Sequence, residues 1–520
     1  MIHKKTILPH MLLSVFLLLW LGLPAAAQQF IVTEKNGRLR YAQTRRGDRI
    51  MDYSHAGYMG GGVALPKVPG VDTVVVTAGV EDYTPLIQSA IDRVSALPVK
   101  DGFRGAVILG PGVFPCSEAI NISADGVVLR GSGTPSDKLT TIMMSGERHA
   151  ALNIRRQGPF RPRTDNPQGV KVTDKYVPFG SSSVHLADAS SFKAGDEVRI
   201  WKPVTSQWIA FMHMDDLWRD GKHQTWLGAG SRLAANRTVS KVSGNRIWFT
   251  VPLPDSYDRE YTSDSTFVSH APNDDHLVKQ SGVENLIVVS PGQAVNHTES
   301  KYYGLRIYGK DCWARDLDFF ETMESVHVGG SRITLRKVSV IRNVDHVGSS
   351  KPAEFAPDGS QVLMDSCYVR GNNLWSVGIG ARIPGPIVML YCTFEGNCRM
   401  QGHQRWSTAF LLDNCKSPDG GIDFLNRGEM GSGHGWTTGW SVAWNCEAKE
   451  FINQNPPGSY NWMIGCIGKR VRQRRPFDKE GPFLPEGEYI SHGTHVVPQS
   501  LYLSQLEERL GKDAVTKMGY

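Results

Sequence analysis

The chain has 520 residues and a formal net charge of +6, with 54 glycines, 9% aromatic residues and 21% charged residues. This composition is that of a folded, turn-rich protein and excludes long disordered regions. The lysines and arginines are scattered, without the basic stripe typical of nucleic-acid-binding proteins, so we expect no nucleic-acid partner.

Residues 1–27 predict a secretory signal peptide. Lys4 and Lys5 precede an apolar core at 11–23, and three alanines at 25–27 form a small-residue cleavage site. The apolar core is too short to span a bilayer, and no later segment is apolar enough for a membrane helix. We therefore expect a secreted or periplasmic protein, exported as in Gram-negative bacteria, with no membrane insertion and a monomeric state.

Residues 28–183 predict an extended leader, one helix and the first coils of a β solenoid. Apolar residues recur at helical spacing between Asp82 and Val94, and either Asp82 or Thr84 can cap the helix start. Terminal coils of a solenoid need a cover, so we expect this helix to close the open end. Short β-type runs follow at 106–109 and 126–130.

Residues 184–270 interrupt the regular spacing of the solenoid coils and predict an inserted antiparallel β module. Four tryptophans lie between its expected strands, namely Trp201, Trp208, Trp218 and Trp226. They can stack on sugar rings or form the core that an insertion needs, and we favour the core.

Residues 271–470 predict the main coils, because five apolar phrases end in cysteine at near-constant spacing. The cysteines are Cys367, Cys392, Cys415, Cys446 and Cys466, with gaps of 25, 23, 31 and 20 residues. Such a period is typical of a solenoid. We expect stacked, reduced, buried cysteines, with a Cys392–Cys398 disulfide as the alternative. Residues 471–520 predict a tail that ends in a helix around Leu501–Leu510.

Two motifs near the predicted first helix resemble the entry of right-handed parallel β-helix proteins of the pectate-lyase superfamily. They are Pro-Gly-Val-Phe at 111–114 and Gly-Val-Val-Leu-Arg-Gly-Ser-Gly at 126–133. Segments 382–386, 402–406 and 433–436 are similar to secreted bacterial members of that group. The resemblance implies an all-β fold: a single-stranded right-handed parallel β-helix with an N-terminal capping helix, a small inserted β module and a C-terminal tail helix. Such scaffolds host lyases, hydrolases and non-enzymes.

Three arginines recur with the coil period. Arg382, Arg405 and Arg427 lie 23 and 22 residues apart, and adjacent coils are separated by about 4.8 Å, so their side chains can align on one face. An aligned row of arginines suits an anionic substrate, since guanidinium groups bind carboxylates and sulfates in a bidentate manner. The alternative is an internal ladder with carboxylates, for which the candidates are Glu395, Asp413, Asp423 and Glu429.

Two histidines flank this row. His403 and His434 can exchange protons near neutral pH, and Tyr460 in the next coil is a further acid or base. We therefore predict His403, His434, Arg405 and Tyr460 as catalytic residues. The predicted substrate-binding residues are Arg382, Arg427, Trp406, Trp436 and Asn426.

These residues favour a polysaccharide lyase that cleaves a uronate-containing polysaccharide, with or without sulfate groups, by β-elimination. Arginine would neutralise the carboxylate, and histidine or tyrosine would move the protons. The alternatives are a glycoside hydrolase, which needs a carboxylate pair among Asp413, Asp423 and Glu429, and a non-catalytic glycan-binding protein. Calcium-dependent pectate lyases gather acidic side chains on neighbouring coils, whereas this stretch is rich in Arg, His and Trp. We therefore expect no metal and no cofactor, with calcium as the less favoured alternative.

Overall fold

The computed structural model describes residues 31–33, 38–158, 168–263, 265–296, 298–478 and 480–520. The signal peptide expected at 1–27 lies outside the described residues. Among the described residues, no helix is both long and apolar enough to cross a membrane.

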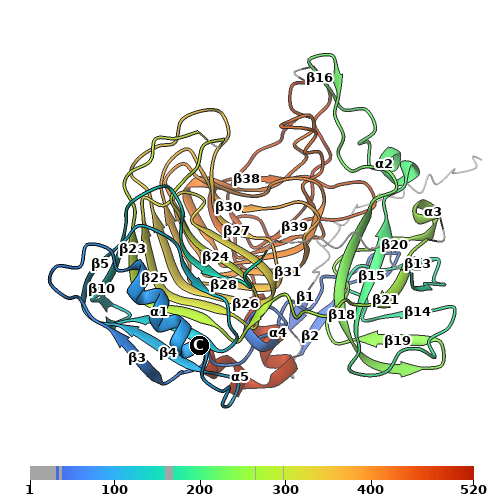
Figure 1. Ribbon diagram of the computed structural model, residues 1–520. Helices are drawn as coiled ribbons and strands as arrows, with labels where there is room; N and C mark the ends of the chain where they lie inside the picture. The colour runs from blue at the N-terminus through green and yellow to red at the C-terminus, as the bar shows by residue number, and fades with distance from the viewer. Residues whose placement is uncertain (1–30, 34–37, 159–167, 264, 297, 479) are drawn as a thin grey trace, which may run out of the picture.

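The main body is a coil of parallel strands (Figure 1), in which each turn adds one strand to each of three ladders. Ladder A contains β3 (Gly70–Val74), β4 (Gly105–Leu109), β7 (Val127–Gly131), β23 (Gly282–Val289), β25 (Trp313–Phe320), β26 (Val326–Ile341), β28 (Ser360–Asp365), β31 (Pro384–Leu390), β34 (Ser407–Asp413), β36 (Thr438–Gly439), β37 (Val442–Trp444), β39 (Trp462–Ile464) and β41 (Glu488–Ile490).

The other two ladders complete each coil. Ladder B contains β5 (Gly112–Cys116), β10 (Thr140–Met144), the second halves of β23, β25 and β26, β29 (Tyr368–Arg370), β32 (Thr393–Glu395) and the starts of β35 (Lys416–Phe424), β38 (Glu447–Asn453) and β40 (Ile467–Arg470). Ladder C contains β6 (Ile120–Ile122), β11 (Ala150–Ile154), β22 (Val278–Lys279), β24 (Tyr303–Lys310), the first half of β26, β27 (Ala353–Pro357), β30 (Trp375–Ile379), β33 (Arg399–Gly402) and the ends of β35, β38 and β40. The predicted right-handed parallel β-helix is confirmed.

The corner between ladders A and B explains the cysteine spacing. A residue with positive φ turns the chain there in successive coils, and examples are Ser366 (φ 56°), Tyr391 (φ 51°), Asn414 (φ 56°) and Asn445 (φ 50°). The residue that follows each of them is a cysteine that faces the interior. The Cys415 Sγ donates to the Met389 carbonyl at 3.2 Å and the Cys446 Sγ to the Leu412 carbonyl at 3.3 Å, so each thiol bonds to the preceding coil.

All eight cysteines are free and buried, which confirms the reduced ladder and shows that the alternative Cys392–Cys398 disulfide is wrong. A disulfide would remove the thiol donors that bond to the neighbouring coils.

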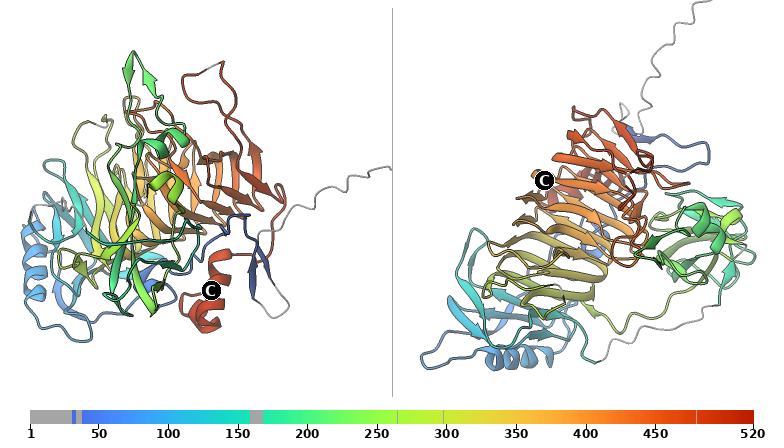
Figure 2. Two further views of the ribbon diagram at one scale, coloured as in Figure 1. Left: turned by 90° about the vertical axis from the view of Figure 1, so that its right-hand side faces the viewer. Right: turned by 90° about the horizontal axis from the view of Figure 1, so that it is seen from above.

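Helix α1 (Thr84–Ser95) covers one end of the coils, as Figure 2 shows. Its buried face of Ile87, Ala90, Ile91 and Val94 joins the interior core, so the predicted cap is present. Pro85 stands in its first turn, where a missing N–H costs no hydrogen bond.

The inserted module is an antiparallel sheet beside the coils (Figure 2) with its own core. Its strand order is β12 (Val170–Lys171), β21 (Phe267–His270), β15 (Glu197–Pro203), β18 (Arg232–Ser243), β19 (Arg246–Phe249) and β14 (Ser183–His185). The module starts at β12, before the expected residue 184, because Val170 pairs with Val268 at its edge. Smaller pieces are β13 (Tyr176–Val177), β20 (Tyr257–Asp258), α2 (Ser206–Phe211), α3 (Arg259–Thr262) and the hairpin β16 (Trp218–Arg219) and β17 (Lys222–His223).

The leader and the tail lie together on the outer face of ladder A. The leader contains β1 (Ile31–Thr33), β2 (Leu39–Tyr41) and a 3-10 turn at Tyr58–Gly60, and a further hairpin of β8 (Gly133–Thr134) and β9 (Asp137–Lys138) lies in the early coils. The tail adds β41 to ladder A, so the coils extend beyond the expected end near residue 470, and then forms α4 (Leu501–Leu510) and α5 (Lys512–Lys517). The apolar cluster on the outer face of ladder A includes three residues of α4, namely Leu501, Tyr502 and Leu506.

Candidate active site

The two predicted histidines meet in the loops that follow ladder C. His403 comes directly after β33, and His434 lies in the long loop 425–437 of the next coil. Their rings contact each other edge to face, with centroids 4.9 Å apart. Arg427 supports the pair, because its Nη1 donates to the His403 carbonyl at 3.0 Å. The structure therefore brings together three residues that the sequence placed in two different coils.

The surroundings of both histidines hold them neutral. Burial, followed by the charge of Arg427, lowers the pKa of His403 to about 4, and the same causes lower the pKa of His434 to about 3. Burial lowers the pKa of Arg427 to about 10, so its guanidinium is still charged at neutral pH. The site thus combines two imidazoles that can accept a proton with a fixed positive charge. Among the described residues, His434 Nδ1 has no hydrogen-bond partner.

Arg382 and Arg405 follow the coil register through their backbones. The Arg382 N–H donates to the Arg405 carbonyl, and the Arg405 N–H donates to the His434 carbonyl, each at 3.0 Å. Arg382 is exposed, whereas the guanidinium of Arg405 is held by the inserted module and by loop 425–437. Its Nε donates to the Trp226 carbonyl at 2.8 Å and its Nη2 to Ser432 Oγ at 2.7 Å. Arg405 is therefore a positioning residue that fixes the histidine loop.

Trp406 and Trp436 are buried, each with only 3% of its surface exposed. The Trp406 Nε1 donates to Asp255 at 2.9 Å and the Trp436 Nε1 to the Met212 carbonyl at 3.0 Å. Their role as substrate-binding residues stays a prediction, and Trp436 also lines the larger cavity that contains Tyr460. Both side chains join the module to the coils.

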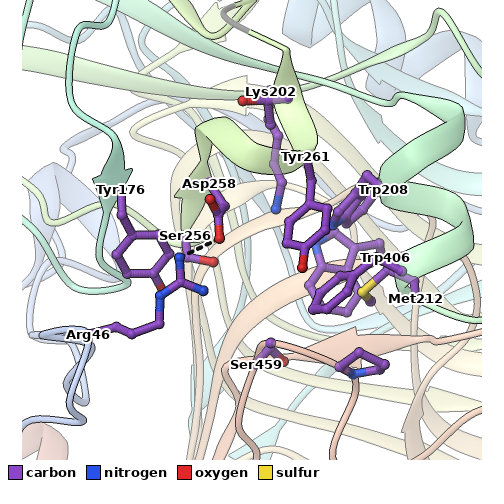
Figure 3. Close-up of a pocket in the computed structure, with 14 residues that line it drawn as sticks. Arg46, Tyr176, Lys202, Trp208, Met212, Ser256, Asp258, Tyr261, Trp406 and Ser459 are labelled. Carbon is purple, nitrogen blue, oxygen red and sulfur yellow. Dashed lines mark hydrogen bonds and ion pairs between the residues drawn. The ribbon is translucent and has the colours of Figure 1, made fainter.

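Figure 3 shows this junction, where Lys202 and Trp208 of the module face Trp406. Lys202 forms a buried ion pair with Asp255 at 2.9 Å. The pocket between them has a volume of about 20 Å³, which is room for a water molecule and not for a sugar. Trp208 and Trp226 are buried, with exposures of 4% and 1%, but they pack in the cluster that joins the module to the coils and not in the module's own core, and Trp218 is 58% exposed. The preferred interpretation of these tryptophans as the module's own core is therefore wrong.

Asn426 and Tyr460 lie apart from the histidine pair. The Asn426 side chain accepts from the Gly428 N–H at 2.7 Å and shapes loop 425–437. The Tyr460 ring packs against Trp440 and Trp462. Both residues line a cavity of about 460 Å³ whose wall does not include His403, His434 or Arg427.

The carboxylates considered as partners of the arginine row are bound elsewhere. Asp423 forms a bidentate pair with Arg399 at 2.6 Å, Glu429 pairs with Arg475, and Glu395 accepts from the Tyr368 hydroxyl. Asp413 is completely buried and accepts from Ser500 Oγ and the Tyr502 N–H, each at 2.7 Å. The arginines of the row therefore do not form the alternative internal ladder with these acids.

The sequence reasoning missed Trp375. This half-buried indole on β30 lies between two cations, with the Arg427 guanidinium 5.4 Å and the Lys351 ammonium 5.3 Å from its ring centre. It pairs in register with Arg399, 24 residues later, so the coil period was the signal that could have found it. Beside His403, Gln401 is buried, and among the described residues its Nε2 has no partner. Earlier on the same face, His327 lies 3.3 Å from Asp358.

Within the described residues, no group of three or more His, Cys, Asp or Glu side chains is arranged to hold a metal ion. The expectation of metal independence stays a prediction.

The fold defines the chain as a parallel β-helix protein. No family model matches it, and no curated protein sequence does. Similar solved structures include the Gp54 tailspike of Acinetobacter baumannii bacteriophage AP22 in complex with capsular saccharide, at 12% identity over 79% of this chain and 66% of that chain, with a TM-score of 0.37. An exopolygalacturonase from Thermotoga maritima has 10% identity over 84% and 95% of the two chains, with a TM-score of 0.34.

The A-module of the mannuronan C-5 epimerase AlgE6 from Azotobacter vinelandii has 11% identity over 81% of this chain and 97% of that chain, with a TM-score of 0.28. These scores support no conclusion about substrate or reaction, so the function is argued from the site alone.

Proposed function

We propose that the protein is a secreted polysaccharide lyase that cleaves a uronate-containing polysaccharide by β-elimination. The observation that carries the proposal is the contact of His403 with His434 beside Arg427. The Arg427 guanidinium and the Lys351 ammonium both lie over the Trp375 ring, so a second cation beside Arg427 supports an anionic substrate. Export is part of the proposal and rests on the sequence of residues 1–27.

The proposed chemistry uses the charge and the bases already in place. Arg427 pairs with the uronate carboxylate and stabilises the enolate-like charge that develops when the C5 proton leaves. One neutral histidine takes that proton. The C4–O4 bond then breaks as the C4–C5 double bond forms, and the imidazolium returns the proton to O4, so protons and charge balance.

Substrate binding strengthens the base. The charge of Arg427 depresses the pKa of both histidines in the free protein. A bound carboxylate offsets that charge and raises the histidine pKa toward its usual range. Because Tyr460 lines a separate cavity, the proposal assigns both proton transfers to the histidine pair.

The hydrolase alternative has weaker support. A hydrolase needs two carboxylates that face one glycosidic bond. Asp413 is buried beneath the tail, Asp423 is bound to Arg399, and Glu429 is bound to Arg475. None of the three is free to act as an acid on a sugar.

The test is incubation of the purified protein with a panel of uronate polysaccharides. A lyase generates an unsaturated uronate with ultraviolet absorbance. New reducing ends without that absorbance would indicate a hydrolase, and binding without cleavage would indicate a glycan-binding protein. Activity should persist in EDTA, and loss of activity that calcium restores would overturn the expectation of metal independence.

A further inference from the structure

A second site lies in the cavity of about 460 Å³ that contains Tyr460, a volume in the range of ligand pockets. Four segments distant in sequence form it: the turn after α2, loop 425–437, the coil loop 455–460 and the tail residues Arg475, Leu484 and Pro485. The walls from these segments include Met214, Pro456, Pro457, Leu484 and Pro485. Apolar walls beside a tyrosine suit the apolar face of a sugar ring.

The wall also contains polar side chains. Tyr460 and Asn455 line the cavity together with His213. A phenol, an amide and an imidazole can each exchange hydrogen bonds with the hydroxyl groups of a sugar.

The charge of the cavity is balanced. Its one arginine, Arg475, is already paired with Glu429 and also donates to the Asp216 carbonyl. Apart from the imidazole of His213, the described lining residues include no cation without a partner that would favour an anionic ligand, in contrast to the site at Arg427, where the guanidinium lies over Trp375. The cavity is suited to an uncharged sugar.

Loop 425–437 joins the two sites. Asn426 and Trp436 line the cavity and pair with each other as a β-bridge, while Arg427 and His434, which lie between them in the chain, form the histidine site. Loop 425–437 therefore contributes residues to both the cavity and the histidine site.

We propose that the cavity binds a neutral sugar residue of the substrate, so that the polysaccharide is a heteropolymer of uronate and neutral sugars. The inference rests on the proposed function for the acidic residue, but the binding of a neutral sugar is measurable by itself. The probes are neutral disaccharides of glucose, galactose, mannose, xylose and N-acetylglucosamine, together with a diuronate, titrated by calorimetry.

The main variant is Leu484→Trp, which fills the cavity from the half-buried tail loop. At least one neutral disaccharide should bind the wild type, and the substitution should weaken its binding by about tenfold or more. The matched control is Leu510→Trp, since Leu510 is an exposed leucine at the end of α4. This control should bind the disaccharide as the wild type does.

A second variant keeps the test valid if Leu484→Trp does not fold. Tyr460→Phe removes only a hydroxyl from a residue that lines the cavity and should weaken binding of the same disaccharide by about fivefold, the value of one hydrogen bond. Three results would each overturn the inference. They are equal affinity of the wild type and both folded cavity variants, no binding of any neutral disaccharide, and loss of diuronate binding in Leu484→Trp.

The readout separates this inference from the lyase proposal. His403→Ala should still bind the neutral disaccharide with unchanged affinity, because His403 does not line the cavity. If no polysaccharide is cleaved, the lyase proposal fails and the titration still decides on the cavity.

Discussion

His403 and His434 differ from ordinary surface histidines in what surrounds them. Each ring is partly buried against the other, and a guanidinium stands beside them. Replacing either histidine by Ala should lower kcat by about 10²–10⁴-fold, the usual size of a lost acid–base contribution. Turnover is followed by the ultraviolet absorbance of the product, with the exposed His276 changed to Ala as the control. Near wild-type turnover in both histidine variants would give the pair a purely structural role.

The depressed histidine pKa values predict the pH dependence of the reaction. A neutral base is lost when it is protonated, so kcat/KM should fall only as the pH drops toward about 4. Arg427→Ala removes a nearby positive charge and should move this acid limb to higher pH, whereas Arg427→Lys, which keeps the charge, should not. If kcat/KM fell at the same pH in both Arg427 variants, the charge of Arg427 would not be a cause of the low histidine pKa values.

The same shifts predict how stability depends on pH. The folded-state pKa values of both histidines lie below the ordinary value of 6.5, so the folded state binds fewer protons than the unfolded state. Their contribution is present above pH 6.5 and is lost as the pH falls through about 4 and then about 3. The double change of His403 and His434 to Ala should reduce this acid-induced loss, as measured by urea unfolding across that range.

At the scale of the elements, the cysteine ladder is part of the coil packing. The Cys392 and Cys415 thiols bond to carbonyls of the preceding coil, and burial raises the pKa of Cys392. Thiols of this kind are unreactive. All eight cysteines should resist a thiol reagent in the native protein and react after denaturation, and a reductant should leave the unfolding midpoint unchanged. Fewer than eight reactive thiols in the denatured protein would indicate a disulfide.

The tail helix α4 depends on one carboxyl group. Asp413 accepts hydrogen bonds from Ser500 Oγ and the Tyr502 N–H at the start of the helix. Asp413→Ala leaves both donors buried and should cost about 2–4 kcal/mol of unfolding free energy. Faster amide exchange in 500–517 should accompany the loss. Asp419→Ala, at an exposed position of the next strand, is the control and should change neither quantity.

The coils were predictable because their period is local. Each turn from ladder A to ladder B places one buried residue after one residue with positive φ, so Cys392, Cys415 and Cys446 mark the same corner in successive coils. The spacing also predicted that Arg405 would align with Arg427, but the Arg405 N–H donates to the His434 carbonyl, so His434 and not Arg427 lies next to Arg405 in the following coil. The contacts of the individual side chains were not predictable, because they are made with residues far away in the sequence. Trp226 bonds to the Trp436 carbonyl from 210 positions earlier in the chain, and this docking is what buries Trp436.

At the scale of the whole molecule, the inserted module is tied to the coils through Asp255. Its carboxylate pairs with Lys202 and accepts from the indoles of Trp406 and Trp440. Asp255→Ala should cost about 3–5 kcal/mol, because it leaves a buried cation unpaired. Activity should also fall, since Arg405 takes its position from the module. The exposed Asp220 changed to Ala is the control, and unchanged stability of Asp255→Ala would refute this role.

The leader and the tail hold each other on the outer face of ladder A. Gln505 accepts from the Tyr53 N–H and donates to the Met51 carbonyl, and the Tyr502 hydroxyl donates to the Ala56 carbonyl. Two segments far apart in the sequence, 51–56 and 501–510, thus form a contact that can be made only after α4 has been synthesised. A chain cut before α4 would retain its coils but expose the apolar outer face of ladder A beneath this contact to self-association.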